Sequence, residues 1–318
     1  MMKSFLEYLT ESERQMTANT VLSDINEIQC GYILNGNSWY SSDAKAAFEA
    51  RVKQAKPEEV EDAIGKAKAM AEEFLKWAKA NGYSGVVKNV WWTARPGELA
   101  RASNSDADSK KNPTDILVLF TSGPANGFLG LSAKATKTKG DIGFKNPGVG
   151  TVDRSLGISL AAEYKNQESQ LIKMLDLPSS ADARKKFIRS NAAIKTQTEK
   201  IGQQVLAAMR DELLVRLQKM NNKELLAYLL KDWMDADVLY PPYVKVTGQG
   251  NKPPYKAVVM DPTKNEKLDA LANYPIKLEP IGNESIGVSA GGKKIMKMRF
   301  KFESEKMASS VKMSGDPW

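Results

Sequence analysis

The sequence predicts a mixed α/β protein, and three local patterns support this prediction. Residues 57–80 place apolar side chains at three- and four-residue spacing, which is typical of an amphipathic helix. Residues 86–93 are rich in β-branched and aromatic residues, which favours a strand. Residues 296–302 alternate strictly between apolar and basic side chains, as a half-buried strand does.

The first half of the chain is predicted to form one helix and three strands. Pro57 suits the first turn of a helix, and Asn81-Gly82 is a common stop. The strand over 86–93 ends before Arg95-Pro96-Gly97. Residues 115–120 and 128–134 then form two further strands, joined by a turn that contains Gly123, Pro124 and Gly127.

The second half is predicted to be helical first and strand-rich later. A Gly- and Lys-rich loop covers 135–150, and Asp153 can cap a helix that runs to about Leu175 and ends before Pro178. Residues 181–235 are mainly helical, and strands follow the break at Tyr240-Pro241-Pro242. We therefore expect an N-terminal extension (1–55), a core (56–180), a helical segment (181–240) and a strand-rich C-terminal region packed with the core (241–318).

The composition excludes several kinds of active site. The 318 residues include no histidine and one cysteine, so the chain alone builds neither a Ser-His-Asp triad nor a zinc finger, and it has no intramolecular disulfide. Acid–base chemistry must then use Asp, Glu, Lys, Tyr or a metal-bound water. The longest apolar run, Ile116–Phe120, is far shorter than the roughly 20 residues of a membrane helix, so we expect no membrane partner.

The charge pattern predicts a polyanionic partner, with DNA first. The chain has 46 Lys and Arg against 38 Asp and Glu, a net charge of +8, and the excess gathers in residues 131–147, 183–219 and 293–312. Solvated faces without a partner are the alternative explanation. The candidate nucleic-acid contacts are Arg95, Lys137, Lys139, Lys145, Arg184, Lys185 and Lys186.

The candidate chemistry lies on the predicted hairpin. Asp115 opens one strand and Lys134 ends the next, and these two ends are neighbours in an antiparallel pair. A carboxylate can bind Mg²⁺, which polarises a phosphate and activates a bound water, while an ammonium orients the water or stabilises developing charge. The spacing therefore predicts a site for phosphodiester hydrolysis.

These residues resemble the PD-(D/E)xK nuclease superfamily, which includes many restriction endonucleases. The resemblance covers roughly 57–175 and implies a restriction-endonuclease-like core with a mixed central sheet flanked by helices. Asp115 matches the first metal-binding acid, and Lys134 matches the lysine of the second half-motif. Glu73, on the flank of the 57–80 helix, is similar to the family's helix glutamate.

One position departs from the family pattern. Ser132 stands where the second carboxylate normally lies, so the missing acid must come from elsewhere or be lost. Glu163, on the predicted helix after the basic loop, is the leading substitute as second metal ligand, with Asp153 and Asp141 as the other candidates.

The resemblance implies a Mg²⁺-dependent endonuclease that hydrolyses DNA, with Mn²⁺ as an alternative ion. A non-catalytic DNA-binding or virion-associated phage protein that keeps the fold is the main rival, and an RNA-processing nuclease is a third hypothesis. The sequence leaves open whether the chain forms a homodimer. The expected location is the cytoplasm, which is that of a bacterial host for a phage-encoded protein, or else the virion.

Overall fold

The chain forms two structural units. The computed structural model describes residues 18–109, 111–136, 144–234, 236 and 239–318. Unit 1 consists of Met1–Ile142 and Val238–Pro262, and unit 2 consists of Gly143–Asp237 and Thr263–Trp318. The bounds of these units differ from those of the four segments expected from the sequence, because the expected core over 56–180 contributes to both units.

Unit 1 is built on a mixed five-stranded sheet in the order β1-β2-β3-β4-β5. Its strands are β1 (Ser84–Trp92), β2 (Ile116–Ser122), β3 (Phe128–Thr136), β4 (Tyr243–Gln249) and β5 (Lys256–Met260). β1, β2 and β3 pair in antiparallel fashion, β4 is parallel to β3, and β5 is antiparallel to β4. The predicted hairpin is confirmed, and β4 returns to it only after residues 143–237 of unit 2 have intervened.

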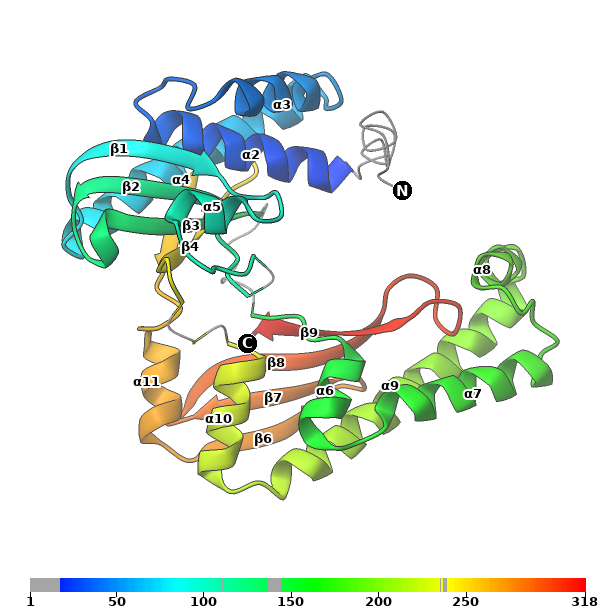
Figure 1. Cartoon of the computed structure of the whole chain (residues 1–318). Helices are drawn as coiled ribbons and strands as arrows, with labels where there is room; N and C mark the ends of the chain where they lie inside the picture. Colours follow the sequence, from blue (N-terminus) through cyan, green and yellow to red (C-terminus); the bar gives the residue numbers. More distant parts are fainter. Residues whose placement is uncertain (1–17, 110, 137–143, 235, 237–238) are drawn as a thin grey trace, which may run out of the picture. The chain divides into compact units, whose positions relative to one another are not determined.

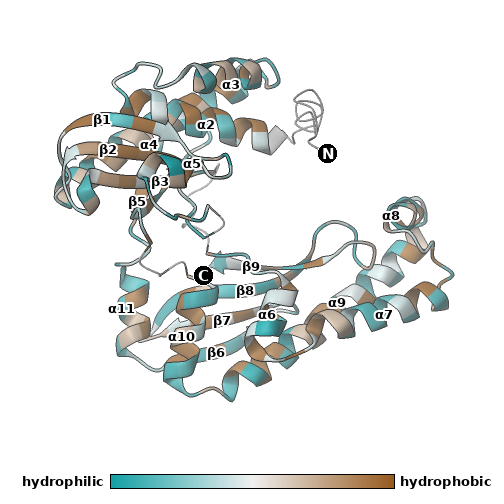
Figure 2. Cartoon of the chain, viewed as in Figure 1, coloured by the Kyte–Doolittle hydropathy of each residue, from teal (hydrophilic) through white to brown (hydrophobic). Residues whose placement is uncertain are grey.

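Two helices, α2 (Ala18–Leu34) and α4 (Pro57–Ala80), pack on this sheet (Figure 1). The helix predicted over 57–80 is therefore confirmed to the residue. Apolar side chains of both helices join the strands in one buried core, among them Cys30, Met70, Phe74, Ile116 and Leu131. β2 is mostly brown in Figure 2, in keeping with the burial of Ile116, Leu117 and Val118.

The described part of the expected N-terminal extension, residues 18–55, belongs to unit 1. Val21, Ile25 and Ile28 are each at most 3% exposed and recur every three or four residues along α2, so burial of this face explains the helix. α3 (Ser42–Val52) packs on α2 through Ala44 and Ala47. A short helix, α5 (Glu98–Ser103), follows β1, and a 3₁₀ turn (Ala125–Gly127) joins β2 to β3.

Unit 2 combines helices with an antiparallel sheet in the order β6-β7-β8-β9. The strands are β6 (Ile276–Ile281), β7 (Ser285–Ala290), β8 (Lys293–Phe302) and β9 (Val311–Pro317). The helices are α6 (Val149–Leu156), α7 (Leu160–Met174), α8 (Ala181–Ser190), α9 (Ala192–Gln218), α10 (Asn222–Asp232) and α11 (Glu266–Asn273). The alternation over 296–302 is confirmed, since Met296, Met298 and Phe300 are fully buried against the helices.

The single helix expected over 153–175 is wrong. The chain forms α6 and α7 instead, because Gly157 adopts a left-handed conformation (φ 65°) that ends α6. Asp153 does cap a helix, but from the last turn of α6: its carboxylate accepts hydrogen bonds of 2.9 Å from the N–H groups of Leu160 and Ala161 at the start of α7.

Candidate functional site

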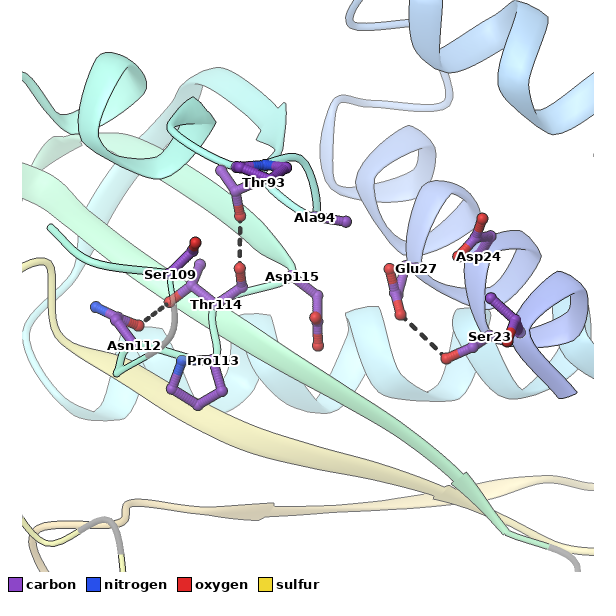
Figure 3. A pocket seen from close by; sticks show the side chains of 12 residues that line it. Ser23, Asp24, Glu27, Thr93, Ala94, Ser109, Asn112, Pro113, Thr114 and Asp115 are labelled. Atoms are coloured by element: carbon purple, nitrogen blue, oxygen red, sulfur yellow. Dashed lines mark hydrogen bonds between the residues drawn. The ribbon is translucent and has the colours of Figure 1, made fainter. Parts of the chain in front are cut away.

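A cavity of about 470 Å³ lies in unit 1 between α2 and the segment that leads into β2 (Figure 3). Its acids are Asp24 and Glu27 from α2 and Asp115 from the start of β2. The rest of the lining is short and mostly polar: Thr20, Ser23, Thr93, Ala94, Pro96, Ser109, Asn112, Pro113 and Thr114. None of these lining residues is basic, so the cavity favours a cation. We call it the acidic pocket.

Backbone pairing fixes Asp115 at the edge of the acidic pocket. The Asp115 N–H donates to the Leu131 carbonyl at 3.0 Å, while Leu131 is also the register partner of Ile116. Two residues of one segment thus oppose one residue of β3, as in a β-bulge, which re-aims a side chain. The Asp115 Oδ2 atom accepts a 2.7 Å hydrogen bond from the Ala133 N–H.

The segment before Asp115 is held by its own polar side chains. The Asn112 Nδ2 atom donates to the Pro241 carbonyl at 2.9 Å, and the Thr114 hydroxyl donates to Asn112 Oδ1 at 2.7 Å. The Thr93 hydroxyl donates to the Thr114 carbonyl at 2.6 Å (Figure 3). These contacts tie the loop to β1 and to the approach of β4, so the carboxylate is presented on a rigid support.

Glu27 is the residue that sequence reasoning missed. It is 8% exposed and faces Asp115 across the acidic pocket (Figure 3). Its Oε1 atom accepts from the Ser23 hydroxyl at 3.0 Å, and its Oε2 atom accepts from the Trp92 indole N–H at 3.1 Å. Because Glu27 is buried and accepts hydrogen bonds from two donors, its carboxylate has a fixed position and differs from the solvated acids on a helix surface.

Burial raises the pKa of both acids, and neighbouring carboxylates add to the rise. The pKa of Glu27 rises to about 8, because burial and the nearby charges of Asp115 and Asp24 outweigh the hydrogen bonds from Trp92 and Ser23. The pKa of Asp115 rises to about 6, mainly through burial. Lys134 offsets this effect in part for Asp115, whereas Glu27 has only neutral donors and other carboxylates near it, so a bound cation would favour its ionised form.

Ser132 and Lys134 lie beside Asp115, as the hairpin predicts. The Ser132 hydroxyl hydrogen-bonds the Asp115 carboxyl, and the Lys134 ammonium lowers its pKa, both acting against burial. Ser132 is 5% exposed, whereas Lys134 is exposed. Lys245 on β4 is the register partner of Ser132, and burial together with Lys134 lowers the pKa of Lys245 to about 8.

The two glutamates assigned from the sequence lie elsewhere. Glu73 is on α4, where it pairs with Lys76 and does not line the acidic pocket. Glu163 is on α7 of unit 2, where it accepts a 3.0 Å hydrogen bond from Gln167. Asp153 serves as the cap of α7, and Asp141 lies outside the described residues. In unit 1 the helix acid beside Asp115 is Glu27, and its signal in the sequence was the apolar spacing of Val21, Ile25 and Ile28.

The predicted phosphate contacts have varied surroundings. Arg95 pairs with Asp43 at 3.5 Å, and the Lys145 ammonium donates to the Lys231 carbonyl at 3.1 Å. Lys186 is exposed on α8. Lys137 and Lys139 lie outside the described residues.

Arg184 has an internal role in place of the predicted phosphate contact. It is 4% exposed, and its Nε atom donates to the Met307 carbonyl at 3.0 Å. Its Nη1 atom donates to the carbonyls of Pro178 and Ser179, and its Nη2 atom pairs with Glu168 at 2.7 Å. The guanidinium thus joins the start of α8 to α7 and to the segment after β8.

Replacing Arg184 by Met should lower the free energy of unfolding by about 3 kcal/mol, because it leaves Glu168 and three carbonyls without their charged donor. Lys185→Met, next to it in the sequence, removes only a partly exposed pair with Asp182 (3.7 Å) and should cost less than about 1 kcal/mol. Urea denaturation measures both. Equal stabilities for the two variants would contradict the internal role of Arg184.

Comparisons with known proteins found no matching family model and no matching curated protein. Within the described residues, no group of three or more His, Cys, Asp or Glu side chains is placed to hold a metal ion. In the same part of the chain, no helix has the length and apolar character needed to cross a membrane.

Proposed function

We propose that this chain is a Mg²⁺-dependent nuclease that hydrolyses phosphodiester bonds in DNA, with a restriction-endonuclease-like core in unit 1. The observation that carries the proposal is the buried pair Glu27 and Asp115 beside Lys134, whose raised pKa values reflect a cost of holding two buried carboxylates that a bound cation would offset. The order of an acid-bearing helix followed by strands agrees with the resemblance of the sequence to that superfamily.

The donor set of the acidic pocket fits magnesium. Mg²⁺ is usually held by one or two carboxylates, with water and substrate phosphate completing the shell. Glu27 and Asp115 would be the protein ligands, and Mn²⁺ is the natural substitute because it prefers the same oxygen donors. When bound, the ion would acidify a water and balance the charge of a phosphate. This assignment puts Glu27 where the sequence suggested Glu163.

The protein side chains divide the remaining work. Ser23 and Trp92 orient the Glu27 carboxylate, and the Ala133 N–H orients Asp115. These donors hold both carboxylates ready without reorganisation when substrate arrives. Lys134, exposed near the end of β3, acts electrostatically on Asp115 and would stabilise charge on the phosphate or orient the attacking water.

Replacing Lys134 by Met should reduce Mg²⁺-dependent plasmid cleavage by about a hundredfold or more, the usual effect of removing one charge-stabilising donor. Magnesium should still raise the melting temperature, since both carboxylates remain. Lys68→Met, an exposed lysine on α4, is the matched control and should cleave like the wild type. Unchanged cleavage by the Lys134 variant would remove this residue from the proposed mechanism.

A non-catalytic nucleic-acid-binding protein, including one associated with a phage virion, is the second candidate. Ser132 in place of an acid, and a pair of carboxylates where three would bind more tightly, favour it. Purified chain that retards DNA on a gel but leaves it uncut in both Mg²⁺ and Mn²⁺ would support this alternative. The same gels run with RNA decide between the two nucleic acids.

A further inference from the structure

The sheet of unit 2 has one apolar face and one basic face. Ile286, Val288, Met298 and Phe300 are fully buried in a core shared with α6, α9, α10 and α11, so these helices cover the apolar face (Figure 1). Side chains alternate between the two faces of a strand, and register partners share a face. The strands therefore carry on the opposite face two acids, Glu279 and Asp316, and six basic residues, Lys277, Lys294, Lys297, Arg299, Lys301 and Lys312. We call it the basic sheet face.

Trp318 holds one of these lysines in place. A Cβ atom at Gly287 would lie 2.7 Å from the Trp318 ring, so the indole packs directly on this glycine. Gly287 is the register partner of Lys297, which puts the ring on the basic sheet face. The Lys294 ammonium lies 4.8 Å from the centre of the ring, so its charge belongs to the same face.

Two of the six basic side chains are paired with an acid. Arg299 pairs with Asp316 at 2.9 Å, and Lys312 pairs with Glu303 at 2.5 Å. The others form no ion pair in the part of the chain that the structure describes: Lys277, Lys294, Lys297 and Lys301. The basic sheet face therefore keeps an excess of positive charge, which an anionic partner would balance.

Two lysines of this face oppose each other directly. Lys301 on β8 is the register partner of Lys312 on β9, and like charges in this position destabilise a sheet. Glu303 pairs with Lys312 and leaves Lys301 uncompensated. An anion that lay over both ammonium groups would turn this repulsion into two attractive contacts.

The basic side chains of β8 form a row. Lys297, Arg299 and Lys301 are every second residue of the strand, so roughly 7 Å separates neighbours along it. A single phosphate ion reaches only part of such a row, whereas a nucleic-acid strand carries a negative charge at every nucleotide. The arrangement therefore suits a polyanion better than a small anion.

We propose that the basic sheet face binds the phosphate backbone of DNA without reading its sequence. The inference rests on the proposed DNA partner of the chain, and it assigns backbone contacts to unit 2, whereas Glu27 and Asp115 belong to unit 1. Contacts from Lys and Arg to phosphates supply sequence-independent binding. An anionic membrane surface also attracts lysines, so the test includes one.

The test removes two unpaired lysines together and measures binding without cleavage. The Lys297→Gln, Lys301→Gln double variant should bind a short fluorescent duplex in EDTA several-fold more weakly, as measured by anisotropy. Each phosphate contact contributes about 0.9 to the slope of log affinity against log salt, so the slope should fall by about 2. Two duplexes of unrelated sequence should lose affinity equally. The control, Lys165→Gln with Lys173→Gln, changes two exposed lysines of α7 and should bind like the wild type.

Acetylation gives a second readout that needs no variant. Mass spectrometry of wild type treated with acetic anhydride should show that duplex DNA protects Lys277, Lys297 and Lys301 but not Lys165 or Lys173. Equal affinity and salt slope in wild type and double variant, or equal acetylation with and without DNA, would overturn the proposal. So would binding to phosphatidylserine vesicles that depends on the two lysines while DNA binding does not.

The same proteins separate this proposal from the nuclease. A wild type that never cuts in Mg²⁺, with a double variant that loses DNA affinity, would overturn the nuclease and keep the basic sheet face. A wild type that cuts, with a double variant that binds DNA equally well, would do the reverse.

Discussion

Replacing Asp115 by Asn should reduce Mg²⁺-dependent DNA cleavage by about a thousandfold or more. The substitution keeps the size of the side chain but removes one of the two charges proposed to hold the ion, and metal-ion stabilisation of a phosphoryl transition state is worth several kcal/mol. The Ala133 N–H can still donate to the amide oxygen, so the bulge at the start of β2 should persist. Cleavage of supercoiled plasmid, followed over time on agarose gels, measures the loss.

Two controls make this result specific. Glu73→Gln and Glu163→Gln change acids that the sequence suggested but that lie on the surfaces of α4 and α7, so both should cut like the wild type. A melting curve shows that each variant is folded. Wild-type rates for Asp115→Asn would contradict the assignment of this residue as a metal ligand.

Replacing Glu27 by Gln should stabilise the chain at alkaline pH. The pKa of Glu27 is about 8 in the folded chain and about 4.5 when unfolded, so the folded state binds the proton more tightly. The free energy of unfolding of the wild type therefore falls as pH rises from about 4.5 to 8. Gln carries no charge at any pH, so the variant should exceed the wild type by about 2–4 kcal/mol at pH 9.

Mg²⁺ should stabilise the wild type at alkaline pH but not the Glu27 variant. An ion that binds the folded chain stabilises it in proportion to its occupancy, and the ion binds only deprotonated carboxylates. At pH 9 it should therefore raise the melting temperature of the wild type and leave that of Glu27→Gln unchanged. Urea and thermal denaturation of both proteins at pH 5 and pH 9, each with Mg²⁺ or EDTA, measure these effects. A Glu27 variant that is less stable at pH 9, or that gains as much from Mg²⁺, would contradict the cation site.

The sequence was a good guide wherever the signal is local. The helix over 57–80 and the hairpin that joins Asp115 to Ser132 and Lys134 depend on spacing, on turn residues and on antiparallel pairing of neighbours. These interactions join residues close along the chain, so they can be inferred without a fold. The half of the candidate site that lies on the hairpin follows from them.

The other half depends on contacts that are distant in the sequence. Glu27 reaches Asp115 only because α2 packs on β1, β2 and β3, which no spacing rule encodes. The choice of Glu163 assumed that the chain after β3 stays with the same core, whereas it enters unit 2 and returns at residue 238 to supply β4. The prediction that Arg184 contacts phosphate was wrong for a related reason, since a basic run in the sequence does not reveal which of its members is buried.

The most direct test of the proposed site compares three proteins in one assay. Wild type, Glu27→Gln and Glu73→Gln are incubated with supercoiled DNA and Mg²⁺ at pH 8, and the initial rates of nicking are compared. The structure predicts that wild type and Glu73→Gln cut at the same rate and that Glu27→Gln is inactive. Nicking by Glu27→Gln at the wild-type rate, or loss of nicking only in Glu73→Gln, would contradict the acidic pocket as the catalytic site.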